Sequence, residues 1–375
     1  SSSSSSSSSG SGSGSGSANI SPLLAEAQIQ GQDTAGGGAE DGQAHHIVTM
    51  LECFTFRAHP CFVFRSFGIN LYEYLKASQF QGLGLGQVRR VALQLLKALR
   101  HLKSLGIVHC DIKPENVLLK SSPGKEGGTG PALDEGGMEV VLCDFGSSCC
   151  VGSSFPSYMQ SRFYRAPEVV LRLRQQGDEE EGDGQRQGEE EHGVTEVFNV
   201  NATPAPTTTT AILDEIKSSY VYSHELDMWS LSAMLPELRT GSPCFPAESE
   251  QDLFACQCEV LGLPPKSLLE RVSPEVLADL IEMGAEDGQA RLKDSLLTTP
   301  CGSSRQVGSR PVVSIARARK NDAKFVDFLQ NGLAWDPLER LDVDKALSHE
   351  WVQGSAHQRH RRDKDRRSPG NTEEG

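Results

Sequence analysis

The first 75 residues of the chain contain no lysine, because the most N-terminal lysine is Lys76. No site upstream of that position can therefore use a lysine ammonium group. The sequence also lacks a run of about 18 apolar residues, the length that a membrane-spanning helix needs, and no basic stretch followed by an apolar one opens it. From these absences we expect neither a membrane span nor a secretory signal.

A cysteine framework is missing as well. The ten cysteines follow no disulfide pattern. The close pairs Cys149-Cys150 and Cys256/Cys258 lack the second pair or the histidine cluster that a zinc site requires. We therefore expect reduced thiols and an intracellular protein, in the cytoplasm, the nucleus or both.

Three segments are too poor in apolar residues to build a core, and we expect them to be disordered. Residues 1–43 are of low complexity, residues 173–219 form an insertion, and residues 352–375 form a basic tail. The net charge of −14 has a strong local source, because residues 178–191 of the insertion contain eight acidic residues and one arginine. We interpret the insertion as a solvated loop, with modulation of basic substrates as the alternative. A nuclear-localisation or nucleic-acid patch is the alternative for the tail, but no nucleic-acid partner is expected.

Three short motifs carry the chemistry. Residues 109–116 read HCDIKPEN, residues 144–146 read DFG and residues 165–168 read RAPE, in the order and spacing of a protein kinase. In such a site Asp111 would accept the proton of the substrate hydroxyl and Lys113 would lie against the phosphoryl group of ATP. Asn116 and Asp144 would each hold Mg²⁺ through an oxygen atom. A polar loop and a strand-ending turn would explain one motif, whereas three in register favour phosphoryl transfer.

The segments around the motifs fit these roles. Residues 88–105 place apolar side chains on one face at helical spacing, namely Val88, Leu95, Leu99 and Leu102. Gly106 then ends the predicted helix. Short apolar runs at 107–108, 117–119 and 140–142 predict strands that flank the motifs. The candidate catalytic groups therefore lie on loops between buried elements.

The motifs closely resemble those of the dual-specificity tyrosine-regulated (DYRK) protein kinases, within the CMGC group. The resemblance rests on the cysteine before Asp111, on DFGSSC at 144–149 and on YMQSRFYRAPE at 158–168, and it extends from about Ile47 to Trp351. It implies an α+β, protein-kinase-like fold over residues 44–351. Residues 44–67 would be a remnant of the β-rich N-terminal lobe with the hinge, and residues 68–351 would be the mostly helical C-terminal lobe.

The resemblance implies a serine/threonine kinase that phosphorylates protein substrates and autophosphorylates one activation-loop tyrosine, here Tyr158. Arg162 and Arg165 would bind that phosphate through their guanidinium groups. They would do so without help from the arginine that many kinases have where this chain has Cys110. An ordinary loop tyrosine is the alternative for Tyr158. We expect the chain to be a monomer.

Other residues take structural or nucleotide-binding roles by the same resemblance. Glu168 would form a buried ion pair with Arg340, and Asp227 would accept backbone hydrogen bonds from the catalytic loop. The adenine of ATP would lie against Phe64 at the back of its pocket and against the hinge, from Arg65 to Phe67. A core aromatic is the simpler interpretation of Phe64, and it is compatible with a place at the back of the adenine pocket.

The parts of a kinase that grip the phosphates of ATP have no counterpart before Lys76. Residues 10–14 read GSGSG, but serines flank them instead of the apolar strands that a nucleotide loop requires. Glu26 is a candidate for the helix glutamate that normally pairs with the ATP-binding lysine, and here it has no lysine to pair with. We therefore expect the chain as given to be a weak or inactive kinase.

Two explanations of this absence stay open. The chain begins with Ser1 and its first methionine is Met50, which favours an incomplete record of an active kinase. The alternative is a pseudokinase that serves as a non-catalytic scaffold, although the four motif residues for acid–base and magnesium chemistry all remain.

Three residues also depart from the family pattern. Ser232 replaces a glycine, Pro156 replaces a tyrosine, and Pro236 lies inside the helix that carries Asp227. An interior proline is expected to kink that helix or to cost about 3 kcal/mol.

Overall fold

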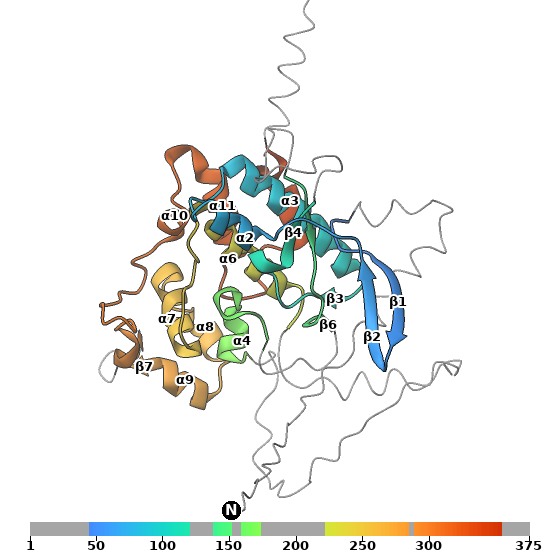
Figure 1. Ribbon diagram of the computed structural model, residues 1–375. Helices are drawn as coiled ribbons and strands as arrows, with labels where there is room; N and C mark the ends of the chain where they lie inside the picture. The colour runs from blue at the N-terminus through green and yellow to red at the C-terminus, as the bar shows by residue number, and fades with distance from the viewer. Residues whose placement is uncertain (1–44, 121–137, 152–158, 174–221, 285–288, 355–375) are drawn as a thin grey trace, which may run out of the picture.

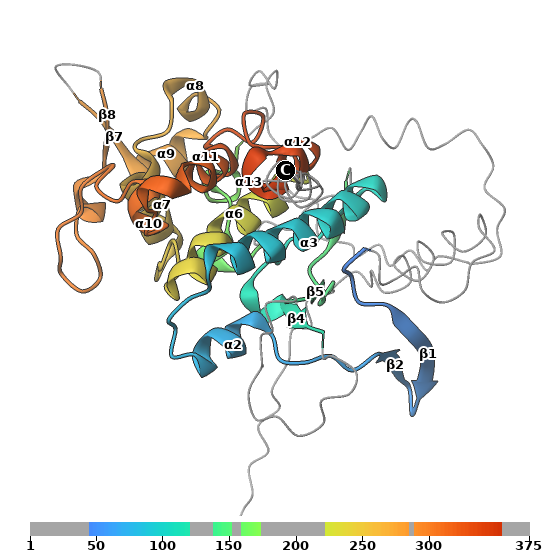
Figure 2. The ribbon, with the colours of Figure 1, turned by 90° about the horizontal axis from the view of Figure 1, so that it is seen from above.

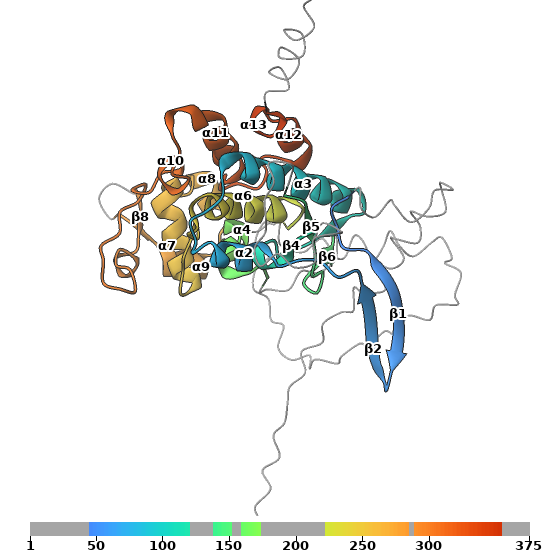
Figure 3. The ribbon, with the colours of Figure 1, turned by 45° about the horizontal axis from the view of Figure 1, so that its top comes forward.

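The computed structural model describes residues 45–120, 138–151, 159–173, 222–284 and 289–354 (Figure 1). Most of them belong to a helical body, and one two-stranded hairpin projects from its edge, as Figures 2 and 3 show from other directions. This is the predicted α+β fold, with a mostly helical lobe and a remnant of a β-rich lobe. The segment 1–43 lies outside the described residues, as do almost all of the insertion and of the tail.

The long amphipathic helix predicted from its periodicity and the three short strands predicted from apolar runs are present. The helix is α3 (Leu85–Ser104), and its four predicted apolar positions are buried. Gly106 follows it with φ +68°, a left-handed conformation that glycine adopts without strain. The strands pair antiparallel in two small sheets, one of β3 (Ile107–Val108) with β6 (Cys149–Cys150) and one of β4 (Val117–Leu119) with β5 (Val140–Leu142).

Strands β1 (Met50–Phe56) and β2 (His59–Phe64) form the projecting hairpin. The two turn residues, Arg57 and Ala58, have φ values of 48° and 63°, the sign that a tight type I′ hairpin turn requires. Five large apolar side chains of the hairpin are exposed, namely Leu51, Phe54, Phe56, Phe62 and Phe64. A hairpin of two strands is marginally stable in water. Within the described residues, no packed layer covers these five side chains.

Both ends of the hairpin are joined to the sheet of β4 and β5. On the way in, the backbone N–H of Val48 donates to the carbonyl of Leu142 (2.9 Å). On the way out, the N–H of Gly68 donates to the carbonyl of Leu119 (2.8 Å). The predicted hinge therefore connects the hairpin to the same sheet that flanks the catalytic loop.

Helix α6 (Glu225–Thr240) lies at the centre of the helical body, and 14 of its 16 residues are buried. It runs through Pro236 and ends at Gly241, which has φ +76°. The proline therefore does not end the helix. Burial of nearly the whole helix offsets the hydrogen bond that a proline cannot make.

Ser232 is accommodated by a close approach between α6 and α11 (Ala323–Gly332). A Cβ atom on Gly332 would meet the Ser232 side chain closer than atoms can approach. The hydroxyl of Ser232 donates to the carbonyl of Met228 (2.8 Å) and so satisfies its own hydrogen-bonding need. The extra bulk of Ser232 is therefore matched by the missing side chain of Gly332.

The remaining elements surround this centre (Figures 1 and 2). Helix α13 continues to Gln353, two residues past the boundary that the sequence suggested. Among the helices of the described segments, none is long and apolar enough to cross a bilayer. The helices and strands that surround α6 are α2 (Leu71–Ala77), α4 (Pro167–Leu171), α7 (Glu250–Leu261), α8 (Lys266–Leu269), α9 (Pro274–Leu280), β7 (Ile281–Met283), β8 (Ala290–Leu292), α10 (Val312–Ile315), α12 (Val343–Ser348) and α13 (Glu350–Gln353).

Candidate active site

The catalytic loop starts where β3 ends, and α6 fixes its backbone. The carboxylate of Asp227 accepts hydrogen bonds from the N–H groups of His109 (2.7 Å) and Cys110 (2.9 Å), as the sequence predicted. Cys110 has φ +63°, so the chain turns sharply here. Burial raises the pKa of Asp227 to about 7, although the two N–H groups lower it. These contacts fix the backbone directly before Asp111 and so orient the Asp111 side chain.

Three side chains converge on the carboxylate of Asp111. Lys113 Nζ donates to Oδ2 (2.7 Å), Ser161 Oγ donates to Oδ1 (2.7 Å), and Asn116 Nδ2 donates to Oδ2 (3.0 Å). Burial raises the pKa of Asp111, but the hydrogen bonds from Lys113, Ser161 and Asn116 outweigh it and hold the pKa below its ordinary value. At neutral pH the group is therefore a carboxylate, the state that can accept a proton.

Asp144 follows Cys143, whose N–H donates to the carbonyl of Asn116 (2.9 Å), so the two motif segments are adjacent. Both donors of the Asn116 amide are directed at Asp111, so its oxygen Oδ1 is the atom that can face a cation. Asp144 is exposed and has φ +63°. One amide oxygen and one carboxylate are a donor set that suits Mg²⁺, which completes its shell with phosphate oxygens and water.

The ring of His109 connects the two motifs. It is fully buried, and burial lowers its pKa to about 4, so the ring is neutral. Its Nε2 lies 3.1 Å from the carbonyl of Cys143, and its Nδ1 accepts from the N–H of Asp111 (3.2 Å). The proton therefore belongs on Nε2. The ring also packs edge-on against Phe145, with 4.8 Å between centroids.

The two predicted phosphate-binding arginines lie in the described segment 159–173, whereas Tyr158 lies outside the described residues. Arg165 is fully buried, and its Nη1 donates to Glu250 Oε1 (2.6 Å). Arg162 is partly buried and donates to the carbonyl of Glu248 (2.7 Å). Both guanidinium groups are therefore engaged near the start of α7.

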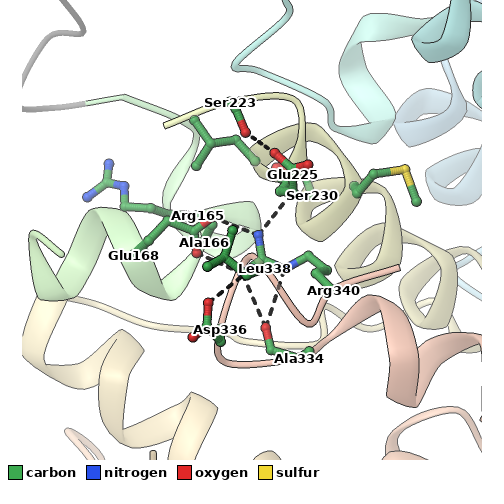
Figure 4. A network of polar contacts seen from close by, with 12 residues as sticks. Arg165, Ala166, Glu168, Ser223, Glu225, Ser230, Ala334, Asp336, Leu338 and Arg340 are labelled. Carbon is green, nitrogen blue, oxygen red and sulfur yellow. Dashed lines mark hydrogen bonds and ion pairs between the residues drawn. The ribbon is translucent and has the colours of Figure 1, made fainter. Parts of the chain in front are cut away.

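The predicted ion pair between Glu168 and Arg340 is present and is bidentate. Nη1 and Nη2 of Arg340 each lie 2.7 Å from one oxygen of Glu168, and both side chains are almost fully buried (Figure 4). Arg340 also donates to the carbonyl of Glu225 (2.8 Å) and lies over the ring of Trp229, 5.1 Å from its centroid. This ion pair therefore ties α4 to α6 and to the loop before α12.

The predicted adenine-binding residues lie at the end of the hairpin. Phe64 ends β2 with 48% of its surface exposed, so the interpretation that it is a core aromatic is wrong. Arg65 is exposed and Phe67 is partly buried. The three residues precede Gly68, whose N–H bonds β4. They therefore border the sheet that carries the catalytic loop.

Several residues of the site were missed from the sequence. Ser161 bridges Asp111 and Lys113, and Gln160 is buried beside it. The hydroxyl of Tyr164 donates to the buried carboxyl of Glu237 (2.6 Å). Ser161 and Tyr164 lie inside the motif YMQSRFYRAPE at 158–168, so their place in this motif could have identified them as site residues. Glu237 carried no local signal, because its partner lies 73 residues away.

Comparisons with known proteins match the chain to protein kinases. The profile of the protein kinase domain matches residues 40–183. Dual specificity tyrosine-phosphorylation-regulated kinase 2 of Drosophila melanogaster is 34% identical over 318 residues, which are 85% of this chain and 34% of the relative. Dual specificity tyrosine-phosphorylation-regulated kinase 4 of Homo sapiens is 32% identical over 311 residues, which are 83% of this chain and 46% of the relative. The chain thus spans less than half the length of these relatives.

Proposed function

Since the chain belongs to the dual-specificity tyrosine-phosphorylation-regulated (DYRK) family of protein kinases, we propose that it transfers the γ-phosphoryl group of ATP to serine and threonine hydroxyls of protein substrates. The observation that carries this proposal is the cluster of Lys113, Ser161 and Asn116 around the ionised carboxylate of Asp111. Phosphoryl transfer depends mainly on positioning and on charge compensation, which such a cluster provides.

Each member of the cluster has a chemical role in the proposal. Asp111 orients the substrate hydroxyl and accepts its proton. Lys113 is held by Asp111 and Ser161, and its ammonium group compensates charge on the phosphoryl group as it moves. Mg²⁺ held by Asn116 and Asp144 would neutralise the phosphate oxygens of ATP.

The phosphate grip is the weak part of this site. No lysine precedes Lys76, and Lys76 itself follows the hinge, on α2. Binding of ATP therefore depends on the hinge and on the magnesium pair, Asn116 and Asp144. We expect slow turnover from this chain.

Autophosphorylation of Tyr158 is part of the proposal. Arg162 and Arg165 lie four and seven residues after it, on the segment that carries Ser161. Their contacts with the start of α7 hold two guanidinium groups in one region. Arg165 is fully buried, and its guanidinium group already donates to Glu250 and to the carbonyl of Gln160. The partly buried Arg162 is therefore the better placed of the two to pair with a phosphate.

The second candidate is a non-catalytic interaction module. Two observations favour it: the absence of lysine before Lys76 and the exposed phenylalanines of the hairpin, which suit burial against a partner. The intact surroundings of Asp111 favour the enzyme.

An assay of phosphoryl transfer tests the proposal. The chain is incubated with γ-labelled ATP, Mg²⁺ and a basic protein substrate, beside Asp111→Asn and beside a sample with a magnesium chelator. We expect slow transfer that requires both Asp111 and Mg²⁺. Labelling no greater than that of Asp111→Asn at saturating ATP would leave the interaction module as the better account.

A further inference from the structure

Gln160 is nearly fully buried, with 5% of its surface exposed, and its backbone has φ +61°. Residues other than glycine seldom adopt this left-handed conformation. Strain of this kind persists only where surrounding contacts hold it, and it is concentrated at functional sites. The contacts of Gln160 therefore identify what the strained conformation serves.

The side-chain amide of Gln160 uses both its donor group and its acceptor. Nε2 donates to the carbonyl of Leu226 (3.0 Å) and to Ser230 Oγ (2.8 Å), and Oε1 accepts from the N–H of Ala166 (2.9 Å). The opposite orientation of the amide would set its oxygen against the carbonyl of Leu226, so the orientation is fixed. The residue is thereby tied to the first turns of α6.

The main chain of Gln160 is held from the other side. Its carbonyl accepts from Nη2 (2.9 Å) and Nε (3.3 Å) of Arg165. The hydroxyl of Ser230, which receives the amide of Gln160, in turn donates to the carbonyl of Tyr164 (2.7 Å). The segment around Gln160 therefore forms a closed loop of hydrogen bonds anchored on α6.

The next residue in the chain is Ser161, whose hydroxyl contacts the candidate active site. It donates to Asp111 Oδ1 (2.7 Å) and accepts from Lys113 Nζ (3.0 Å). Helix α6 thus holds two sides of Asp111. Through Asp227 it binds the backbone before Asp111, and through Gln160 it binds the residue before the hydroxyl that contacts the carboxylate.

We propose that Gln160 is a positioning residue, which sets the distance between Ser161 and Asp111 by fixing the segment before Ser161 on α6. The inference rests on the proposed function, because it assigns Gln160 to the orientation of the group that accepts the substrate proton. A buried glutamine needed only for packing would not require a left-handed backbone directly before a site residue.

The test compares three variants. Gln160→Met keeps a side chain of similar volume and removes the three side-chain hydrogen bonds. Ser161→Ala removes the contact with Asp111 directly and gives the reference effect. Gln94→Met is the matched control, because Gln94 is 6% exposed and bonds Arg90, Met138 and Val140 away from Ser161.

The readout is the rate at which an amine-reactive reagent acylates Lys113, measured by mass spectrometry relative to Lys76. Lys113 is 22% exposed and is held by Asp111 and Ser161, so its reactivity reports their alignment. Ser161→Ala and Gln160→Met are both expected to raise the rate, the second by at least half as much as the first. Gln94→Met is expected to leave the rate unchanged at a similar loss of stability.

Labelling needs no ATP, so it tests Gln160 even if the chain transfers no phosphate. If the chain does turn over ATP, Gln160→Met is expected to lower kcat and to leave the KM for ATP unchanged. A wild-type labelling rate in Gln160→Met, or an equal rise in Gln94→Met, would overturn the inference. If Gln160→Met does not fold, Ser230→Ala replaces it, since it removes one acceptor of the Gln160 amide, and the same rise is expected.

Discussion

Replacing Arg340 with alanine is expected to lower the free energy of unfolding by about 3–5 kcal/mol, because the Glu168 carboxylate is then buried without its partner. Both oxygens of Glu168 lie 2.7 Å from the guanidinium group, and neither side chain has more than 1% of its surface exposed. The variant also loses the hydrogen bond to Glu225 and the contact with the Trp229 ring. Urea unfolding followed by tryptophan fluorescence measures the difference.

The matched control is the ion pair between Lys266 and Glu270, one helical turn apart on the surface. Their side chains are 85% and 64% exposed, and Nζ lies 3.8 Å from the carboxylate. Lys266→Ala is expected to change stability little, because exposed pairs are screened by water and salt. If Arg340→Ala were no more destabilising than Lys266→Ala, the buried pair would not be what joins α4 to the loop before α12.

The carboxyl of Glu237 is expected to make stability depend on pH. Only 4% of the residue is exposed, and burial raises its pKa from 4.5 to about 7, although the hydrogen bond from Tyr164 lowers it. The folded state therefore binds this proton more tightly than the unfolded state, so its contribution is full below pH 4.5 and is lost as pH rises through about 7. With about 1.4 kcal/mol for each tenfold change in proton affinity, the loss is about 3 kcal/mol.

Glu237→Gln isolates this contribution, because a glutamine does not titrate and still offers an oxygen to Tyr164. All other titrating groups are the same in both proteins, so the difference between their unfolding free energies reports Glu237 alone. The wild type is expected to lose about 3 kcal/mol relative to the variant between pH 4.5 and pH 8. In Tyr164→Phe the midpoint of this loss is expected to move to higher pH. A difference that stays constant with pH would mean that Glu237 titrates at its ordinary pKa.

Local patterns in the sequence predicted the elements that carry the site. Helical spacing predicted α3, because its apolar side chains recur on one buried face, and short apolar runs predicted β3, β4 and β5, most of whose residues are buried. The motif residues Asp111 and Asn116 are hydrogen-bonded, and the residue before Asp144 bonds the backbone of Asn116. The pairing of Glu168 with Arg340 and of Asp227 with the catalytic loop followed from the family resemblance.

Contacts between distant segments were not predictable in the same way. The partners of Arg165 and Tyr164 lie 85 and 73 residues further along the chain, and no local period encodes such a distance. The local preference of Pro236 predicts a kink or a loss of stability in α6, and the helix continues through this residue to Thr240 with almost all of its residues buried.

The central proposal is that Asn116 and Asp144 hold Mg²⁺ and that this ion supplies most of the affinity of the chain for the phosphates of ATP. Calorimetric titration of ATP and of adenosine, with Mg²⁺ and with a chelator, tests it most directly in the wild type and in Asp144→Asn. We predict that ATP binds more tightly than adenosine only with Mg²⁺, and that Asp144→Asn removes this advantage. An advantage of ATP that survives in Asp144→Asn and in the chelator would contradict the account.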